Sequence, residues 1–304
     1  MISILLTLVT FILTTTMAFA EFFQDISSII KNNKERLSYG ISVTDFDKDG
    51  QFEFVVTGFR HPNLALSYKK GYLEDVNIDA VFSDDIRSTI GVAACDIDND
   101  GFEELYFLNT DTYSGQKQYS DRLLDNENAI IDLFEIENNL KSLNLTAGRS
   151  VVCVDRNGEG RYGFYVANYG GPTRYYELIK NQIIDKAPML NIDKITGGRA
   201  VVSGHIIGEQ MDIFAANERG PNFLYFNENG TFKNFAEKLG VEDVFENGRG
   251  TTLTDFLYRG KLDIVTGNWQ GEHRIFLKES NKFNDVATNV FKIPSRIRTI
   301  ISAD

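Results

Sequence analysis

The chain has 304 residues, with 43 acidic and 31 basic side chains and a formal net charge of −12. Its hydrophobic content of 42% excludes a disordered chain. The acidic balance argues against a nucleic acid or an anionic membrane surface as the main partner. Two cysteines are too few for a scaffold built on disulfides. The length alone is compatible with two domains or with one large all-β propeller or barrel.

The first twenty residues have the features of a targeting segment. Residues 1–20 carry no charge, are mostly apolar and end in Ala18-Phe19-Ala20, a small-x-small cleavage sequence. We expect a cleaved signal peptide, although the usual basic start is missing; the alternative is a membrane anchor. The remaining chain, residues 21–304, would then be secreted and extracellular without membrane insertion.

A secreted chain meets the glycosylation machinery and an oxidising lumen. Two Asn-x-Thr sequons, at Asn144 and Asn229, predict glycosylation. The second lies in Asn227-Glu-Asn-Gly230, a composition typical of an exposed hairpin turn. Cys95 and Cys153 follow apolar runs. Buried free thiols are the favoured interpretation and a disulfide is the alternative, because the sequence contains no distance between them.

The chain repeats at intervals of about fifty residues. With Asp45 as the marker, the spacings between successive equivalents are 51, 59, 50, 50 and 49 residues, at Asp96, Asp155, His205, Asp255 and Asp304. Short apolar runs before and after each marker, turn residues and further apolar runs predict four short strands per repeat. Four short strands separated by turns in each repeat are typical of the blades of a β-propeller. We therefore expect an all-β propeller of four-stranded blades.

The repeat also predicts local details. Small residues stand five positions before the first five markers, which suits inner strands around a crowded central channel: Gly40, Gly91, Ser150, Ala200 and Gly250. Residues 22–26 read as an outer strand, and helical pieces are expected at 29–37 and 122–143. Since the repeat pattern stops at an inner strand and the first residue of a sixth loop, we expect about five blades of a larger ring, truncated at the C-terminal end.

Two marker loops carry acidic residues in the same register. Positions 1, 3, 5 and 9 are carboxylates and position 6 is glycine, first in Asp45, Asp47, Asp49, Gly50 and Glu53, then in Asp96, Asp98, Asp100, Gly101 and Glu104. Such a loop directs several oxygens into one small volume, and a carbonyl at position 7, from Gln51 or Phe102, adds another. Ca²⁺ is the expected ion, because a flexible ring of oxygens suits a large divalent cation. The alternative is a solvated acidic turn.

The other loops depart from this pattern by degrees. The third keeps oxygen-bearing side chains at positions 1, 3 and 5 as Asp155, Asn157 and Glu159, but has Gly163 at position 9, so it is a doubtful site. In the fifth loop Arg259 at position 5 is expected to replace a cation by pairing with Asp255 and Asp263. The fourth, from His205, has lost the pattern.

Two further features are weaker signals, a recurring Gly-Arg pair and Trp269. A Gly-Arg pair precedes the marker in three successive units, at Arg149, Arg199 and Arg249, and these side chains would stand around one rim of the ring. Pairing with carboxylates of neighbouring blades is the favoured interpretation, and an anion or partner site is the alternative. Trp269 follows a strand and is expected to pack in the core or at the rim.

The loops and their context resemble FG-GAP (integrin-α-type) propeller repeats. Longer stretches resemble the secreted ASPIC/UnbV-type family, the family of the cartilage acidic proteins: residues 90–109, 217–224, 263–269 and 294–299. The resemblance covers essentially the whole of residues 21–304. It implies an extracellular, calcium-binding propeller of seven blades without a catalytic role. In that family further blades, an ASPIC/UnbV segment and often an EGF-like module follow.

Three functions are compatible with these features, one of them a purely structural matrix protein with polyvalent contacts. The favoured one is a non-catalytic extracellular module that binds calcium and contacts a protein or matrix partner. The alternative is an extracellular propeller enzyme, a glycosidase or lyase using paired carboxylates. Against the enzyme, the carboxylates cluster in repeated loops, and His61, His205 and His273 are not part of a nucleophile motif such as Gly-x-Ser-x-Gly.

Overall fold

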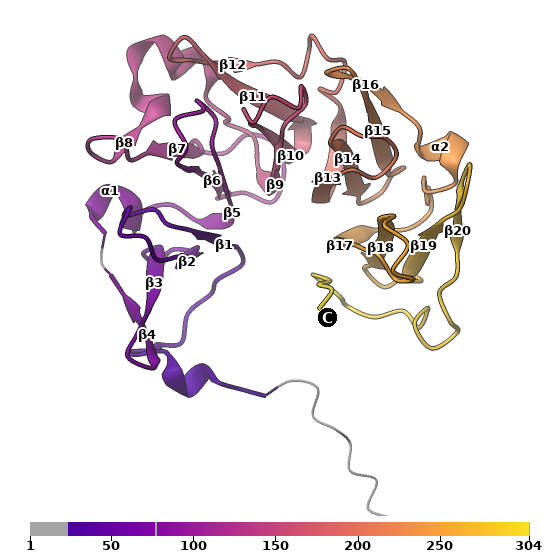
Figure 1. Cartoon of the computed structure of the whole chain (residues 1–304), viewed down its shortest axis with the longest axis horizontal. Helices are drawn as coiled ribbons and strands as arrows, with labels where there is room; N and C mark the ends of the chain where they lie inside the picture. Colours follow the sequence, from indigo (N-terminus) through magenta and orange to yellow (C-terminus); the bar gives the residue numbers. More distant parts are fainter. Residues whose placement is uncertain (1–23, 77, 304) are drawn as a thin grey trace, which may run out of the picture.

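The chain forms antiparallel sheets of four consecutive strands arranged around a common centre, as Figure 1 shows. The structure is a computed structural model that describes residues 24–76 and 78–303. The expected signal peptide, residues 1–20, lies outside the described residues. The all-β propeller predicted from the repeat is confirmed, whereas the number of blades in the complete ring stays a prediction.

Successive strands pair antiparallel within each group of four. Group 1 contains β1 (Ile41–Thr44), β2 (Glu53–Val56), β3 (Leu64–Lys69) and β4 (Tyr72–Asp75), and group 2 contains β5 (Thr89–Cys95), β6 (Glu104–Asn109), β7 (Arg122–Asp125) and β8 (Ile131–Asp132). Group 3 contains β9 (Gly148–Val154), β10 (Gly163–Pro172), β11 (Arg174–Ile179) and β12 (Gln182–Asp185).

Group 4 contains β13 (Ile195–Gly204), β14 (Asp212–Asn217), β15 (Phe223–Glu228) and β16 (Thr231–Asn234), and group 5 contains β17 (Gly248–Thr254), β18 (Asp263–Asn268), β19 (Arg274–Lys278) and β20 (Phe283–Asp285). Groups 3 and 4 are joined by pairing of β10 with β13. The α-helices found among the described residues are single turns, α1 (Ala80–Ser83) and α2 (Ala236–Leu239). None of the helices in the described part of the chain is long and apolar enough to cross a bilayer.

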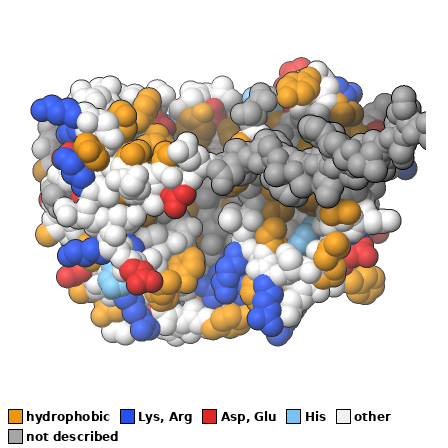
Figure 2. Space-filling view, turned by 90° about the horizontal axis from the view of Figure 1, so that it is seen from below, with side chains coloured by type: hydrophobic (Ala, Val, Ile, Leu, Met, Phe, Trp, Pro, Cys, Tyr) orange, Lys and Arg blue, Asp and Glu red, His pale blue; other side chains and the backbone are white. Residues whose placement is uncertain are grey.

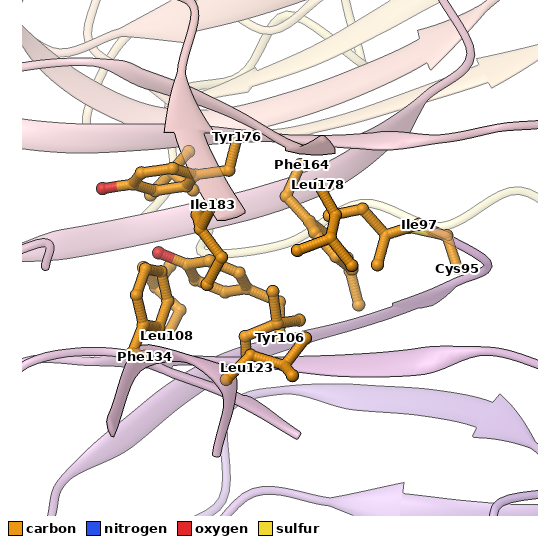
Figure 3. Packing of buried hydrophobic residues seen from close by; sticks show 13 residues of the cluster. Cys95, Ile97, Tyr106, Leu108, Leu123, Phe134, Phe164, Tyr176, Leu178 and Ile183 are labelled. Carbon is orange, nitrogen blue, oxygen red and sulfur yellow. The ribbon is translucent and has the colours of Figure 1, made fainter. Parts of the chain in front are cut away.

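The hydrophobic core lies between neighbouring groups. In β6, Leu105 and Phe107 pack in the cluster shared with group 1, while Tyr106 and Leu108 pack in the cluster shared with group 3. Figure 3 shows this second cluster, with Tyr106 beside Phe134 and Phe164. Side chains point alternately to the two faces of a strand. The second strand of a group is covered on both faces, so its sequence is a continuous apolar run. This explains why these runs were the strongest sequence signal.

The first strands crowd together at the centre, as the small residues predicted. A Cβ atom on Gly40 would lie 2.8 Å from the Cα of Gly91 on the neighbouring inner strand. A Cβ on Gly250 would lie 2.7 Å from the Cα of Thr299. The C-terminal segment therefore lies against β17 as a further inner segment, and Trp269 pairs in parallel with Ser295 beside it.

Three local expectations were wrong. Residues 24–26 are not in a strand, and the predicted helix at 29–37 is reduced to a 3-10 turn, Ser27–Ile29, that precedes it. The predicted helix at 122–143 consists instead of β7, β8 and two 3-10 helices, Leu133–Glu135 and Glu137–Ser142. Pairing of β7 with β6 outweighs the local helical pattern there.

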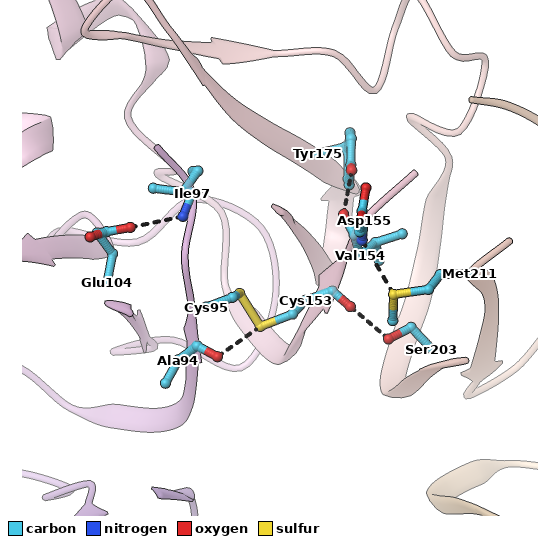
Figure 4. Close-up of a disulfide and its surroundings, with 10 residues drawn as sticks. All are labelled: Ala94, Cys95, Ile97, Glu104, Cys153, Val154, Asp155, Tyr175, Ser203 and Met211. Atoms are coloured by element: carbon cyan, nitrogen blue, oxygen red, sulfur yellow. Dashed lines mark hydrogen bonds between the residues drawn. A yellow bond between two sulfur atoms is a disulfide. The ribbon is translucent and has the colours of Figure 1, made fainter. Parts of the chain in front are cut away.

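The two cysteines form a disulfide, which overturns the favoured interpretation as free thiols. Cys95 ends β5 and Cys153 lies in β9, with their Cα atoms 6.1 Å apart. Figure 4 shows the bond linking these two inner strands. The sequence could not reveal it, because both residues lie in apolar runs and only the side-by-side placement of the two inner strands brings them together.

The two sequons differ in their surroundings. Asn144 is completely buried, and its Nδ2 donates to Asp121 at 2.6 Å and to Asn168 at 3.0 Å. A glycan on Asn144 does not fit this folded structure. Asn229 is exposed in the turn between β15 and β16, where it and Gly230 both have positive φ, as the predicted hairpin requires. Glycosylation of Asn229 stays a prediction.

The surface mixes charges of both signs. On the side that Figure 2 shows, basic, acidic and apolar side chains are interspersed. This face therefore carries no large patch of one charge in the view shown.

The disulfide generates a stability prediction. Replacing Cys95 and Cys153 together by serine should lower the free energy of unfolding by about 2–4 kcal/mol, because the unfolded chain loses a cross-link that spans 58 residues. Denaturant unfolding of the variant and of the oxidised parent measures the difference. Equal midpoints for both, with and without reductant, would contradict the bond.

Candidate metal centres

The two acidic loops are the turns of equivalent hairpins. The first joins β1 to β2 and the second joins β5 to β6. Each loop adopts positive φ at positions 4 and 6, with values of 60° and 85° at Lys48 and Gly50, and 69° and 91° at Asn99 and Gly101. The left-handed turn predicted at position 6 is present, and a Cβ would strain it at a glycine with these angles.

Each loop is anchored by its second and ninth residues. Phe46 and Ile97, at position 2, are buried in the cores on the two sides of group 2. The acid at position 9 accepts the N–H of that same residue, from Phe46 to Glu53 at 3.2 Å and from Ile97 to Glu104 at 2.8 Å. Figure 4 shows the second of these bonds. A buried carboxylate is thus held at the base of each loop.

The loops gather carboxylate oxygens in two places. Oxygens of Asp45, Asp47 and Glu53 lie within 4.8 Å of one another. The second loop does the same with three equivalent residues, Asp96, Asp98 and Glu104. Three anionic oxygens this close are the donor type that Ca²⁺ prefers. The carboxylates at positions 1, 3 and 9 of each loop thus lie close together, as their spacing in the sequence predicted.

The first loop also contains oxygens that lack a hydrogen-bond partner. Asp45 Oδ1 and Glu53 Oε1 are both buried, and neither accepts a hydrogen bond. An unsatisfied buried carboxylate oxygen is costly, and two of them in one cluster fit the coordination of a cation. The carboxylate oxygens of this cluster are therefore suitable ligands for a divalent cation.

Electrostatics at both clusters favours a positive charge. Burial, and then the charges of Asp47 and Asp49, raise the pKa of Glu53. Burial raises the pKa of Glu104 to about 8, with further contributions from Asp98, Asp125 and Asp100. The pKa of Asp98 is raised as well, by burial and by Asp100. Each of these carboxyl groups loses its proton less readily than usual, in part because its neighbours are also negatively charged. A bound cation would offset the repulsion between these negative charges.

The remaining predicted ligands are not part of these two clusters. Asp49 and Asp100, at position 5, accept the N–H two residues on, from Gln51 and Phe102, each at 2.8 Å. Both side chains are tied to the turn in this way. Coordination by Asp49 and Asp100, and by the carbonyls of Gln51 and Phe102, stays a prediction.

Sequence reasoning missed a carboxylate beside the second cluster. Asp125, at the end of β7, contributes to the raised pKa values of Asp98 and Glu104, and its own pKa is raised by burial, with Glu127 and Asp100 adding to it. It lies outside the loop in sequence and follows no spacing pattern, so only the folding of β7 beside β6 reveals it. It adds negative charge to the second site.

The first and second loops touch each other. The ammonium group of Lys48, at position 4 of the first loop, lies 3.9 Å from the centre of the Phe102 ring in the second. The second loop in turn contacts the third, because Arg161 donates to the carbonyl of Asp98 at 3.0 Å. The acidic hairpins therefore form one continuous row on one side of the molecule.

The third loop does not gather its acidic side chains. Asp155 accepts hydrogen bonds from the N–H groups of Gly158, Glu159 and Gly160 at 2.8–3.2 Å, so its carboxylate oxygens stabilise the turn. Arg156 pairs with Glu177 on β11. No cluster of three carboxylates is found here among the described residues. Metal binding by Asp155, Asn157 and Glu159 stays doubtful.

In the fifth loop a guanidinium group occupies the equivalent place. Arg259 donates from Nη2 to both oxygens of the buried Asp263, at 2.9 and 3.2 Å. The expected pairing of Arg259 with Asp263 is present. Asp255, by contrast, accepts only backbone N–H groups from the loop, including that of Arg259 at 2.9 Å. The expected second pairing, of the Arg259 side chain with Asp255, is not among these contacts.

The fourth loop has a lysine in a related position. Asp212, buried at the base of that loop, accepts N–H groups from Ile207 and Asn227. The ammonium group of Lys278, on β19 of the next group, donates to the carbonyls of Ile206 and Ile207. Its charge lowers the pKa of Asp212 against the larger, raising effect of burial. A cation built into the chain thus stands beside each of these two loops.

A family comparison agrees with the hairpins. A model of the FG-GAP-like repeat matches residues 45–107, from the marker of the first loop to β6. The chain is therefore an all-β propeller protein that contains FG-GAP-like repeat sequence.

The sequence comparison is more specific. Cartilage acidic protein 1 of Xenopus tropicalis is 46% identical over 90% of this chain and 47% of that protein. The protein of the same name from Homo sapiens is 43% identical, over 90% of this chain and 46% of its own length. The chain is a homologue of cartilage acidic protein 1, and it spans about half the length of the curated relatives it matches.

Solved structures are more distant. The Vibrio cholerae biofilm matrix protein Bap1 is 15% identical over 82% of this chain and 39% of its own chain, with a TM-score of 0.47. BBS1N, solved in complex with ARL6DN, is 10% identical over 82% of this chain and 68% of its own, with a TM-score of 0.48.

The fifth loop offers a test of the built-in cation. Arg259→Ala should lower the free energy of unfolding by about 1–3 kcal/mol, because Asp263 is completely buried and loses its ionic partner. Arg259→Lys should recover part of the loss, since the charge remains. Denaturant unfolding measures both variants, and an unchanged midpoint for Arg259→Ala would contradict a stabilising role.

Proposed function

We propose that this chain is a calcium-binding extracellular module that contacts a protein or matrix partner and catalyses no reaction. The observation that carries the calcium assignment is the first cluster, where three carboxylate groups converge within 4.8 Å and two of their buried oxygens lack a partner. The equivalent cluster in the second loop supports it. The homology to cartilage acidic protein 1 supports the extracellular placement.

Calcium would act on the fold through the bases of the hairpins. Glu53 and Glu104 each hold the N–H of a buried residue, Phe46 or Ile97, so an ion that fixes either carboxylate also fixes a core side chain. Without an ion, like charges at each base repel one another. We expect bound calcium to stiffen the hairpins and, through their anchors, the cores on both sides of group 2.

The surroundings of His273 support the non-catalytic assignment. This buried side chain faces Ser295, with 2.9 Å between Nε2 and Oγ, a pair that resembles a nucleophile and its base. However, the N–H of Asn268 donates to Nδ1 at 3.0 Å, so the proton lies on Nε2 and is donated to Ser295. In that tautomer the imidazole cannot accept the serine proton.

Calcium binding is tested by titration calorimetry and thermal unfolding. We expect two ions per chain, and a lower melting temperature after chelation. Saturation at a hundred times the dissociation constant would stabilise by about 2.7 kcal/mol per site. The double variant Asp47→Ala, Asp98→Ala should remove both the binding heat and the effect of the chelator on melting.

The matched control is Asp255→Ala, which removes an acid from position 1 of a loop that already contains Arg259. It should alter the melting temperature without changing the calcium-dependent difference. If the parent protein melts at the same temperature with calcium and with chelator, and shows no binding heat, the calcium assignment is wrong.

A further inference from the structure

Four arginines surround the cavity at the centre of the molecule. Arg149 and Arg249 lie near the starts of the inner strands β9 and β17, Arg199 lies within the inner strand β13, and Arg298 lies on the C-terminal segment beside β17. All four line one cavity of about 950 Å³. The first three are the Gly-Arg residues found in the sequence. The fourth follows Arg249 by 49 residues, the spacing of the repeat.

Carboxylates near this cavity compensate only part of the positive charge. Glu218 pairs with Arg199 and with Arg249, the latter at 3.0 Å. Asp111, the one carboxylate among the lining residues, accepts the N–H groups of Gln118 and Tyr119. The expected pairing of the arginines with carboxylates is therefore present for two of them, and the cavity retains an excess of positive charge.

Arg149 and Arg298 have no carboxylate partner among the described residues. The guanidinium of Arg149 donates to neutral oxygens, those of Thr110 at 3.0 Å and Gly148 at 2.9 Å among them, and its buried Nε has no partner. Burial and the nearby charges of Arg199 and Arg249 lower its pKa to about 10. A partly buried cation without an opposite charge carries a desolvation cost, and an anion in the cavity would offset that cost.

Aromatic side chains hold the arginines in place. The Trp269 ring centre lies 4.9 Å from the guanidinium carbon of Arg249 and 5.2 Å from that of Arg298. The hydroxyl of Tyr113 accepts from Arg199 at 2.9 Å, and its ring is also near Arg149, at 5.6 Å. Guanidinium groups oriented in this way can bind oxyanions with their planar forks without first losing much side-chain freedom.

We propose that the central cavity binds a small polyanion that carries two or more sulfate or carboxylate groups, held by Arg149 and Arg298 together with Arg249. More than one anionic group is required because the arginines come from separate strands around the cavity. The volume suits a ligand of small-molecule size. The site shares no residue with the acidic loops, so it can be present or absent independently of calcium binding.

The test is calorimetric titration of the full chain with two probes, inositol hexasulfate and benzene-1,3,5-tricarboxylate, in excess calcium so that chelation by the probe does not empty the loops. We expect one molecule bound per chain, a higher melting temperature, and weaker binding as salt is raised. Binding of the sulfate probe alone, or of the carboxylate probe alone, would support the site and identify the ligand chemistry.

Substitutions locate the binding. Arg298→Gln should weaken it by about tenfold or more, because a charge-assisted contact is lost. Arg149→Gln should do the same, and Arg149→Lys should retain part of the affinity. Arg298 is a useful position to replace because its guanidinium lies over the Trp269 ring, so its substitution should disturb the fold only slightly.

The matched control is Arg60→Gln, at an exposed arginine that does not line the cavity, and it should leave the affinity unchanged. Failure of both probes to bind at millimolar concentration would overturn the proposal. So would binding that is equally strong in Arg298→Gln and in the parent chain.

Discussion

A buried carboxylate at the base of four of the five hairpins is the constraint on which those loops depend. Glu53, Glu104, Asp212 and Asp263 are all completely or almost completely buried, and each accepts an N–H group that closes its loop. The cost of a buried negative charge has to be offset in each of these four repeats. In the fourth and fifth loops the chain supplies a lysine or an arginine. In the first two loops the neighbouring groups are themselves acidic, and under the proposed function the compensating cation comes from solution.

The same reasoning explains why the loops differ so much in sequence while the strands do not. Four of the hairpins share the acid at the base, whereas the residues at positions 3 and 5 vary with how the charge is balanced. Arg259 at position 5 and, under the proposed function, a cation held by three carboxylates are alternative solutions to one electrostatic requirement. Loss of the acidic pattern in a repeat therefore does not mean loss of the hairpin.

The strands and the two acidic clusters were predictable from the sequence because both depend on short-range spacing. The packing of Leu105 and Tyr106 into clusters on opposite faces of β6, for example, follows from the alternation of side chains along a strand that is covered on both sides. What failed depends on contacts between distant segments. Residues 122–125 have a helical composition but pair with β6, and Cys95 and Cys153 meet only because the inner strands of groups 2 and 3 lie side by side. Asp125 joins its site by the same kind of placement, which no local pattern encodes.

The bond between Cys95 and Cys153 encloses the second loop, the whole of β6 to β8 and nearly all of β9 in one covalent circle. A protease that cuts the backbone once inside this circle does not release a fragment, because the two halves remain tied through sulfur. Such a nicked molecule migrates as a single species until a reductant is added. Damage to the segment that carries the second acidic hairpin is therefore retained within the molecule and stays invisible to a size measurement made under oxidising conditions.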